Sequence, residues 1–332
     1  MGHKGKHQFD DNQIRKSINF KRLVFYFLGV LLIISAAVGV TIFIMHQRDF
    51  NAVQAEIAKY NLLDPARSIV GQENFLSTID PARQQMKEIV ARYEKEGNKI
   101  GVYFEFLNTG ANVSINQDAR FWPASLSKMP TVFVVMKQVE EGKWKLSNEL
   151  VLFEEDKDDR FGELYKKPVG TKFTIEELIK ETLINSDNTA HKILVRNLSS
   201  EEYTEMFEAL GMEQLFNEDY NITAKEYSRI FRALYNASYL NRNNSQQLLQ
   251  WLSESKFDEF VGSGLAPNTV FSHKIGEEFK EIVFLDSGIV YVPSRPYLIT
   301  IMVEVKDGGG VERAQEIMKE LSKSAYDYIS QN

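Results

Sequence analysis

The sequence has no cysteine among its 332 residues. This absence excludes disulfide bonds, thiolate metal ligands and a cysteine nucleophile. Basic residues are not in excess either, because 39 lysines and arginines stand against 46 acidic residues and give a net charge of −7. Nucleic-acid binding needs a basic surface, so we expect no nucleic-acid partner. The proportions of hydrophobic (43%) and charged (26%) residues are typical of a folded globular protein.

Charge is also missing from one segment near the N-terminus, where residues 23–45 contain no acidic or basic side chain. A helix of this length, rising ~1.5 Å per residue, can cross the ~30 Å hydrocarbon core of a membrane. Residues 1–22 carry six lysines and arginines against two aspartates, whereas Arg48 and Asp49 cancel after the segment. The positive-inside rule therefore predicts a single-pass anchor in the cytoplasmic membrane, with residues 1–22 inside and the rest outside. The alternative is a cleaved signal peptide, whose apolar region of about 7–15 residues would be shorter.

The pattern after the anchor predicts a linker and one folded domain. Residues 46–80 carry no recognisable chemistry and are predicted to form the linker, so that the domain spans 81–332. Strand-like segments are expected near both ends of this domain, at 100–107, 111–115, 269–276, 281–292 and 297–305. The middle, about residues 143–260, has helical periodicity. We therefore predict an α/β (α+β) fold in which an antiparallel sheet, built from both ends and flanked by helices, carries an inserted all-helical lobe.

The first motif with chemical meaning is Ser125-Leu126-Ser127-Lys128, at the start of a predicted apolar helix. Residues three apart share one helix face, so the Ser125 hydroxyl and the Lys128 amine can touch. A serine hydroxyl needs a base to become a nucleophile, and burial lowers the pKa of a lysine so that it can serve as that base. The spacing alone is weak evidence, since Ser253 and Lys256 repeat it without partner motifs.

Two further motifs follow in the chain. Ser186-Asp187-Asn188 lies on a short connection between predicted helices, where its hydroxyl could relay a proton and its amide could bind a substrate amide. The same three residue types are also the preferred helix caps. Lys274-Ile275-Gly276 lies near the end of a predicted strand. A lysine there can hold a carboxylate, and Gly276 lets a substrate backbone approach closely.

In this order, the three motifs resemble the signature S-x-x-K, S-D-N and K-T-G of class A β-lactamases and penicillin-binding serine hydrolases. The resemblance covers about residues 81 to 330 and implies a β-lactamase-like fold. It implies that Ser125 is the acylated nucleophile, that Lys128 is its general base, and that Ser186 passes a proton to the leaving nitrogen. It implies no metal and no organic cofactor.

The resemblance also implies how the substrate is held. Asn188 would contact a substrate amide, and Lys274 would supply positive charge for a substrate carboxylate. Backbone N–H groups of Ser125 and Glu277 would form the oxyanion hole. The partner is then a small molecule, either a β-lactam or a peptidoglycan stem peptide.

Two departures from the family pattern bear on activity. Ile275 replaces the usual hydroxyl residue of the third motif, and the loss of one charge-assisted hydrogen bond costs about 1.5–3 kcal/mol. The segment 211–223 is too short for the family loop whose glutamate activates the deacylating water, and its acids Glu218 and Asp219 have the wrong spacing. An acyl-enzyme that forms should therefore persist, as in a penicillin-binding DD-peptidase.

The sequence is compatible with three functions. The chain is a β-lactamase, a DD-peptidase with slow deacylation, or a non-catalytic cell-wall binding or sensing module on the same fold. His273 adjoins the third motif, but no sequence feature gives it an aspartate partner. A Ser-His-Asp mechanism is therefore disfavoured against the Ser-Lys mechanism.

Overall fold

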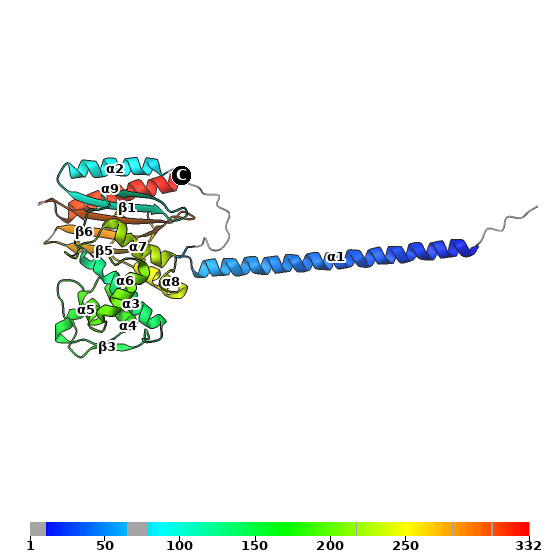
Figure 1. Cartoon of the computed structure of the whole chain (residues 1–332), viewed down its shortest axis with the longest axis horizontal. Helices are drawn as coiled ribbons and strands as arrows, with labels where there is room; N and C mark the ends of the chain where they lie inside the picture. Colours follow the sequence, from blue (N-terminus) through cyan, green and yellow to red (C-terminus); the bar gives the residue numbers. More distant parts are fainter. Residues whose placement is uncertain (1–10, 65–78, 217, 281, 307, 332) are drawn as a thin grey trace, which may run out of the picture. The chain divides into compact units, whose positions relative to one another are not determined.

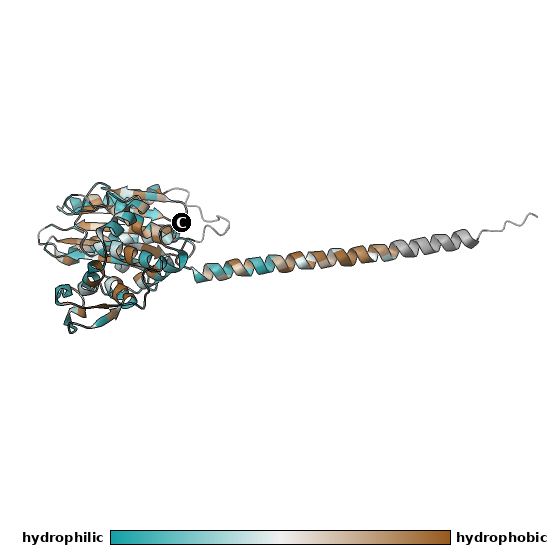
Figure 2. Ribbon diagram, turned by 60° about the horizontal axis from the view of Figure 1, so that its bottom comes forward, coloured by the Kyte–Doolittle hydropathy of each residue, from teal (hydrophilic) through white to brown (hydrophobic). Residues whose placement is uncertain are grey.

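The structure is a computed structural model that describes residues 11–64, 79–216, 218–280, 282–306 and 308–331. Contacts divide the chain after Lys59 into two units. The first contains helix α1 (Asp11–Lys59), and its part from Phe25 to Glu56 is long and apolar enough to cross a membrane. Figure 2 shows the run of hydrophobic residues along this helix. The predicted anchor at 23–45 thus lies in a helix that continues beyond it, while residues 1–10 of the predicted tail lie outside the described residues.

The second unit is built on a five-stranded antiparallel sheet with the order β2-β1-β7-β6-β5. The strands are β1 (Lys99–Phe106), β2 (Ala111–Ile115), β5 (Val270–Glu278), β6 (Val283–Tyr291) and β7 (Tyr297–Glu304). Strands from the two ends of the domain meet where β1 pairs with β7, with Phe104 opposite Ile299. The sheet built from both ends of the domain is confirmed, and each strand ends within two residues of its predicted bounds.

Helices cover both faces of this sheet. Helices α2 (Asp80–Glu94) and α9 (Gly310–Gln331) lie together on one face, and α7 (Ala224–Tyr235) lies on the other (Figure 1). Strand β1 is buried at every position after its first, and all of these residues except Gly101 and Glu105 are apolar or aromatic. One hydrophobic core lies beneath α2 and α9, and a second joins α7 to the helical lobe.

The helical lobe surrounds one central helix. Helix α3 (Lys128–Glu140) is buried from Lys128 through Met136, as its apolar residues on all sides predict. The lobe also contains α4 (Ile175–Ile184), α5 (Asn188–Arg196), α6 (Ser200–Leu210), α8 (Arg242–Leu252), the short hairpin β3 (Glu149–Val151) with β4 (Lys172–Thr174), and the 3-10 helices η2 (Glu154–Asp156) and η3 (Leu164–Lys166). Thr174 and Ser199 form capping boxes that start α4 and α6.

The segment Tyr60–Asp64 packs on this second unit. Leu62 and Leu63 are each 4% exposed, and the Asp64 N–H donates to the carbonyl of Tyr235 at 2.9 Å. Tyr291 donates its hydroxyl to the Leu62 carbonyl at 2.9 Å. The structure thus differs from the predicted linker at 46–80, which is helical to Lys59 and packed from Tyr60. Two consecutive leucines without periodicity gave no signal of this packing, and residues 65–78 lie outside the described residues.

Candidate functional site

Ser125 lies in a tight turn against the edge strand of the sheet. It belongs to the 3-10 helix η1 (Ala124–Ser127), which precedes α3, and Ala124 there has a φ of +44°. A Cβ placed on Gly276 of β5 would lie 3.0 Å from the Pro123 carbonyl oxygen. Glycine at this position therefore leaves room for the turn that carries Ser125. The sequence had instead predicted that it leaves room for a substrate backbone.

Lys128 lies one turn after Ser125, and its side chain is buried. Its Nζ donates to Ser125 Oγ at 3.0 Å, to Asn188 Oδ1 at 2.7 Å, and to Ser186 through the carbonyl at 2.5 Å and Oγ at 3.2 Å. Burial lowers the pKa of this lysine to about 7, although the nearby carboxylates of Asp187 and Asp158 partly oppose the shift. A large fraction of Lys128 is therefore neutral at neutral pH, and its free lone pair can accept a proton as a general base does.

Ser186 connects this lysine to a second one. It lies between α4 and α5 with a φ of +53°, and its Oγ accepts from Lys274 Nζ at 2.8 Å. The following residue, Asp187, is the N-cap of α5 and accepts from the Ala190 N–H at 2.8 Å. The second motif therefore combines a helix cap at Asp187 with side chains that turn toward Lys128.

Lys274 is 1% exposed on β5 and also donates to its neighbour, the Ile275 carbonyl, at 3.2 Å. Burial, reinforced by the charge of Lys128, holds the pKa of Lys274 well below its usual range. Its Nζ lies 5.9 Å from the centroid of the Phe257 ring, and Phe257 packs on Phe161 of the helical lobe with 5.7 Å between ring centroids. Phe257 therefore places an aromatic ring beside Lys274 and contacts the helical lobe through Phe161.

The opposite face of β5 differs from what the sequence predicted. Ile275 is buried in the core beneath α2 and α9, so this position offers no polar group. His273 does have an aspartate partner, because its Nδ1 lies 2.8 Å from Asp286 Oδ1. Side chains alternate along a strand, so this pair faces away from Lys274. No feature of the sequence indicated this partner, and the pairing of β5 with β6 explains the contact.

Glu277 follows on the same face as Ile275. Burial and the neighbouring Glu259 raise the pKa of its carboxyl group. Three carboxylates, those of Glu259, Glu277 and Asp286, therefore lie on or beside this end of β5.

The loop between α6 and α7 holds aromatic rings. Phe216 stacks on Tyr220 at 4.4 Å between centroids, and Tyr220 contacts the Trp122 ring at 5.7 Å. Glu213, Glu218 and Asp219, the acids of this loop, are all exposed. Within its described residues, 212–216 and 218–222, the loop therefore buries no carboxylate that could activate a deacylating water.

Sequence reasoning missed Asp158, because it lies in a charged run that is typical of a solvated loop. Its side chain is 4% exposed and accepts from Asn188 Nδ2 at 3.2 Å. Asp158 also accepts from Arg160 at 2.7 Å and from Lys192 at 3.1 Å. No spacing signal could have identified it, since its contact with Asn188 spans 30 residues of chain.

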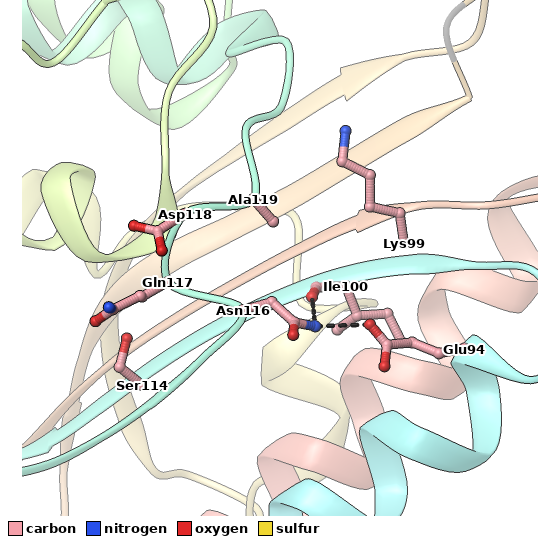
Figure 3. A pocket seen from close by; sticks show the side chains of 8 residues that line it. All are labelled: Glu94, Lys99, Ile100, Ser114, Asn116, Gln117, Asp118 and Ala119. Carbon is pink, nitrogen blue, oxygen red and sulfur yellow. Dashed lines mark hydrogen bonds between the residues drawn. The ribbon is translucent and has the colours of Figure 1, made fainter.

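A separate shallow pocket lies beside β1 and β2 (Figure 3). There, Asn116 donates to Glu94 at 2.6 Å and to the Ile100 carbonyl at 2.7 Å. None of the motif residues lines this pocket. The chemistry of the three motifs therefore belongs to the Ser125 cluster.

Comparison with known proteins gives this cluster a context. A sequence profile described as the beta-lactamase enzyme family matches residues 81–329. Beta-lactamase VEB-1 of Pseudomonas aeruginosa is 20% identical over 69% of this chain and 85% of its own length. Beta-lactamase 3 of Bacillus cereus is 22% identical over 56% of this chain and 63% of its own length.

Solved structures agree with the profile in fold. The structure of PBP-A aligns with a TM-score of 0.70 and 22% identity over 80% of this chain and all of that one. An ancestral class A β-lactamase aligns with a TM-score of 0.68 and 22% identity over 74% of this chain and 99% of that one. A variant of PBP-A, with a TM-score of 0.68 and 21% identity over 76% of this chain and 98% of that one, was solved as an acyl-enzyme complex with penicillin G. The chain belongs to the beta-lactamase enzyme family.

Proposed function

We propose that this protein is a membrane-anchored serine hydrolase that forms an acyl-enzyme at Ser125 with β-lactams or related peptidoglycan amides. The observation that carries the proposal is one continuous hydrogen-bonded chain. It runs from Ser125 Oγ through Lys128 Nζ to Ser186 Oγ and Lys274 Nζ, with distances of 3.0, 3.2 and 2.8 Å. Such a chain can take a proton from the nucleophile and deliver one to a leaving group.

The proposed acylation balances its protons within this chain. Neutral Lys128 takes the proton of Ser125 as Oγ attacks the substrate carbonyl carbon. Backbone N–H groups of Ser125 and Glu277 would stabilise the negative oxygen. As the carbon–nitrogen bond breaks, Ser186 gives its proton to the leaving nitrogen and recovers one from Lys128. Lys128 is then neutral again, and Ser125 carries the acyl group as an ester.

Deacylation needs a base that activates a water molecule for attack on the ester. The acids of the 212–222 loop are exposed, so the described part of this loop supplies no buried base for water. We therefore favour a penicillin-binding peptidase, in which the β-lactam adduct is long-lived, over a β-lactamase with rapid turnover.

The same proposal includes the location of the enzyme. The apolar helix Phe25–Glu56 has the length and composition of a membrane anchor. The basic residues before it favour an N-terminus in the cytoplasm and a catalytic domain outside the cytoplasmic membrane. Peptidoglycan stem peptides are accessible on that side.

The test is to treat the full-length protein in detergent with a fluorescent penicillin and follow the adduct by intact mass spectrometry. We expect an adduct in the wild type, none in Ser125→Ala, and a lifetime much longer than its formation time. Rapid release of hydrolysed penicillin would reject the peptidase and support a β-lactamase.

A non-catalytic wall-binding module is the second candidate, and Ile275 and the loop without a buried carboxylate favour it. It predicts no adduct with penicillin or with acyl-peptide esters, and a Lys128 that titrates like a free lysine. That result would overturn the enzymatic proposal.

A further inference from the structure

We infer that Asp158 is a positioning residue that fixes the side-chain amide of Asn188 and, through it, holds Lys128 beside Ser125. This inference rests on the proposed function of the Ser125 site. It concerns a residue outside the three motifs, at a point where the loop after η2 passes the start of α5. The two contacts that carry it are on opposite ends of one amide group.

The orientation of the Asn188 amide follows from its two partners. Its oxygen accepts from Lys128 Nζ at 2.7 Å, and its nitrogen donates to Asp158 Oδ1 at 3.2 Å. If the amide rotated by half a turn, its N–H₂ group would face a lysine donor and its oxygen would face a carboxylate. Both contacts would be lost at once, so Asp158 keeps the Asn188 oxygen directed at Lys128.

Asp158 is itself held in place. Its backbone N–H donates to Thr189 Oγ1 at 3.0 Å, next to Asn188 on α5. Its carboxylate accepts from Arg160 through Nε at 3.0 Å and through a terminal nitrogen at 2.7 Å, and pairs with Lys192 at 3.1 Å. These hydrogen bonds, of which that to Arg160 is the strongest, hold the pKa of Asp158 well below its usual range. The residue is therefore a permanent anion at neutral pH.

That anion also acts on the charge of Lys128. The charged groups that affect Lys128 are the carboxylates of Asp187 and Asp158, which favour its ammonium form, and Arg160, which disfavours it. The titratable neighbours Lys274 and His191 respond to Lys128 in turn, and burial keeps the pKa of His191 at about 3.

The carboxylate of Asp187 is committed to backbone N–H groups of Ala190, Glu163 and Leu164. Asp158 is therefore the carboxylate whose effect on Lys128 can be changed without removing a helix cap. Loss of its charge would leave Arg160 and Lys192 unneutralised and would lower the pKa of Lys128.

The loop offers a matched control two residues away. Asp156 is also buried, and it also pairs with an arginine, accepting from Arg196 at 2.8 Å. It accepts from the Phe153 N–H as well, and its hydrogen bonds and ion pairs within the described part of the chain reach neither Asn188 nor Lys128. Asp156→Asn, at the end of η2, therefore reproduces the loss of a buried carboxylate two residues away without the loss of the Asn188 contact.

The experiment measures the acylation rate of the full-length protein by a fluorescent penicillin between pH 5 and 9. The acylation rate should rise as Lys128 loses its proton. In Asp158→Asn we expect this rise to occur at a pH that is lower by roughly 0.5–1 unit. Asp156→Asn should leave the pH of this rise unchanged. Asp158→Glu, which keeps the charge, should show the rise near its wild-type pH. Arg160→Gln, at a side chain that is 74% exposed, should shift the rise to higher pH, because it removes a positive charge that lowers the pKa of Lys128.

A second readout does not need catalysis. With ¹³Cε-labelled lysine, the Lys128 resonance is assigned by its loss in Lys128→Arg and titrated by NMR in each variant. Absence of wild-type acylation would reject the proposed function, while this titration would still test the inference. The inference would be overturned if the pH profile of acylation, or the NMR titration of Lys128, were the same in Asp158→Asn as in the wild type. If Asp158→Asn does not fold, an unchanged profile in Arg160→Gln would overturn it instead.

Discussion

Lys274 Nζ donates a 2.8 Å hydrogen bond to Ser186 Oγ, and this contact joins the sheet to the helical lobe. Lys274 belongs to β5, whereas Ser186 lies between α4 and α5. The hydroxyl that would relay protons is therefore held by one lysine from the sheet and by a second, Lys128, from the helical lobe. Changes on either side of this contact should be visible in acylation.

The pH dependence of acylation should report Lys128. Because burial lowers its pKa to about 7, the reactive neutral amine becomes dominant as the pH rises through 7. The acylation rate by a fluorescent penicillin should therefore fall about tenfold for each pH unit below that value. Circular dichroism over the same range controls for unfolding. A limb above pH 9 would mean that Lys128 titrates as an ordinary lysine, and would contradict the base assignment.

Gly276→Ala should displace the nucleophile. The added methyl group would lie 3.0 Å from the Pro123 carbonyl oxygen and 3.3 Å from Ala124 and Leu126, so the turn that carries Ser125 must move. We expect a loss of about 1–3 kcal/mol in the free energy of unfolding and a larger loss of acylation. Denaturant unfolding and adduct formation measure the two effects. Gly39→Ala in α1, with nothing within 4 Å of the new Cβ, is the control, and equal behaviour of the two variants would contradict the prediction.

Leu63→Ala should destabilise the second unit, although the sequence predicts that this residue lies in the linker before the folded domain. The side chain is 4% exposed, and its removal from a packed core costs about 2–4 kcal/mol. Thermal unfolding of the full-length protein measures the change, beside Val53→Ala at an exposed position of α1. An unchanged melting temperature in Leu63→Ala would show that the segment Tyr60–Asp64 contributes nothing to the domain.

The sequence predicts the sheet well because its strands are rich in aromatic and β-branched residues and turn residues separate them. It distinguishes Ser125–Lys128 from the repeat at Ser253–Lys256 only through the partner motifs, and the structure places Ser253 at the C-terminal end of α8. It predicts that Ser125, Lys128, Ser186, Asn188 and Lys274 form one site, and these side chains do form one hydrogen-bonded cluster.

What the sequence does not predict are contacts between residues that lie far apart in the chain and belong to no motif. Asp158 meets Asn188 only because the loop after η2 returns to the start of α5, and His273 meets Asp286 through the pairing of β5 with β6. Leu62 and Leu63 pack on helices that begin more than 150 residues later. Each of these contacts depends on the tertiary fold, which neither periodicity nor spacing encodes.

The contact between Lys274 and Ser186 also determines when the cluster around Ser125 can be completed during synthesis. Lys274 follows Ser125 by 149 residues, and β5 is added to the growing chain after the whole helical lobe. A chain that is still being made, or one broken before β5, therefore contains Ser125 without a complete proton path. The hydrogen-bonded cluster is therefore completed only when nearly the entire polypeptide has been synthesised.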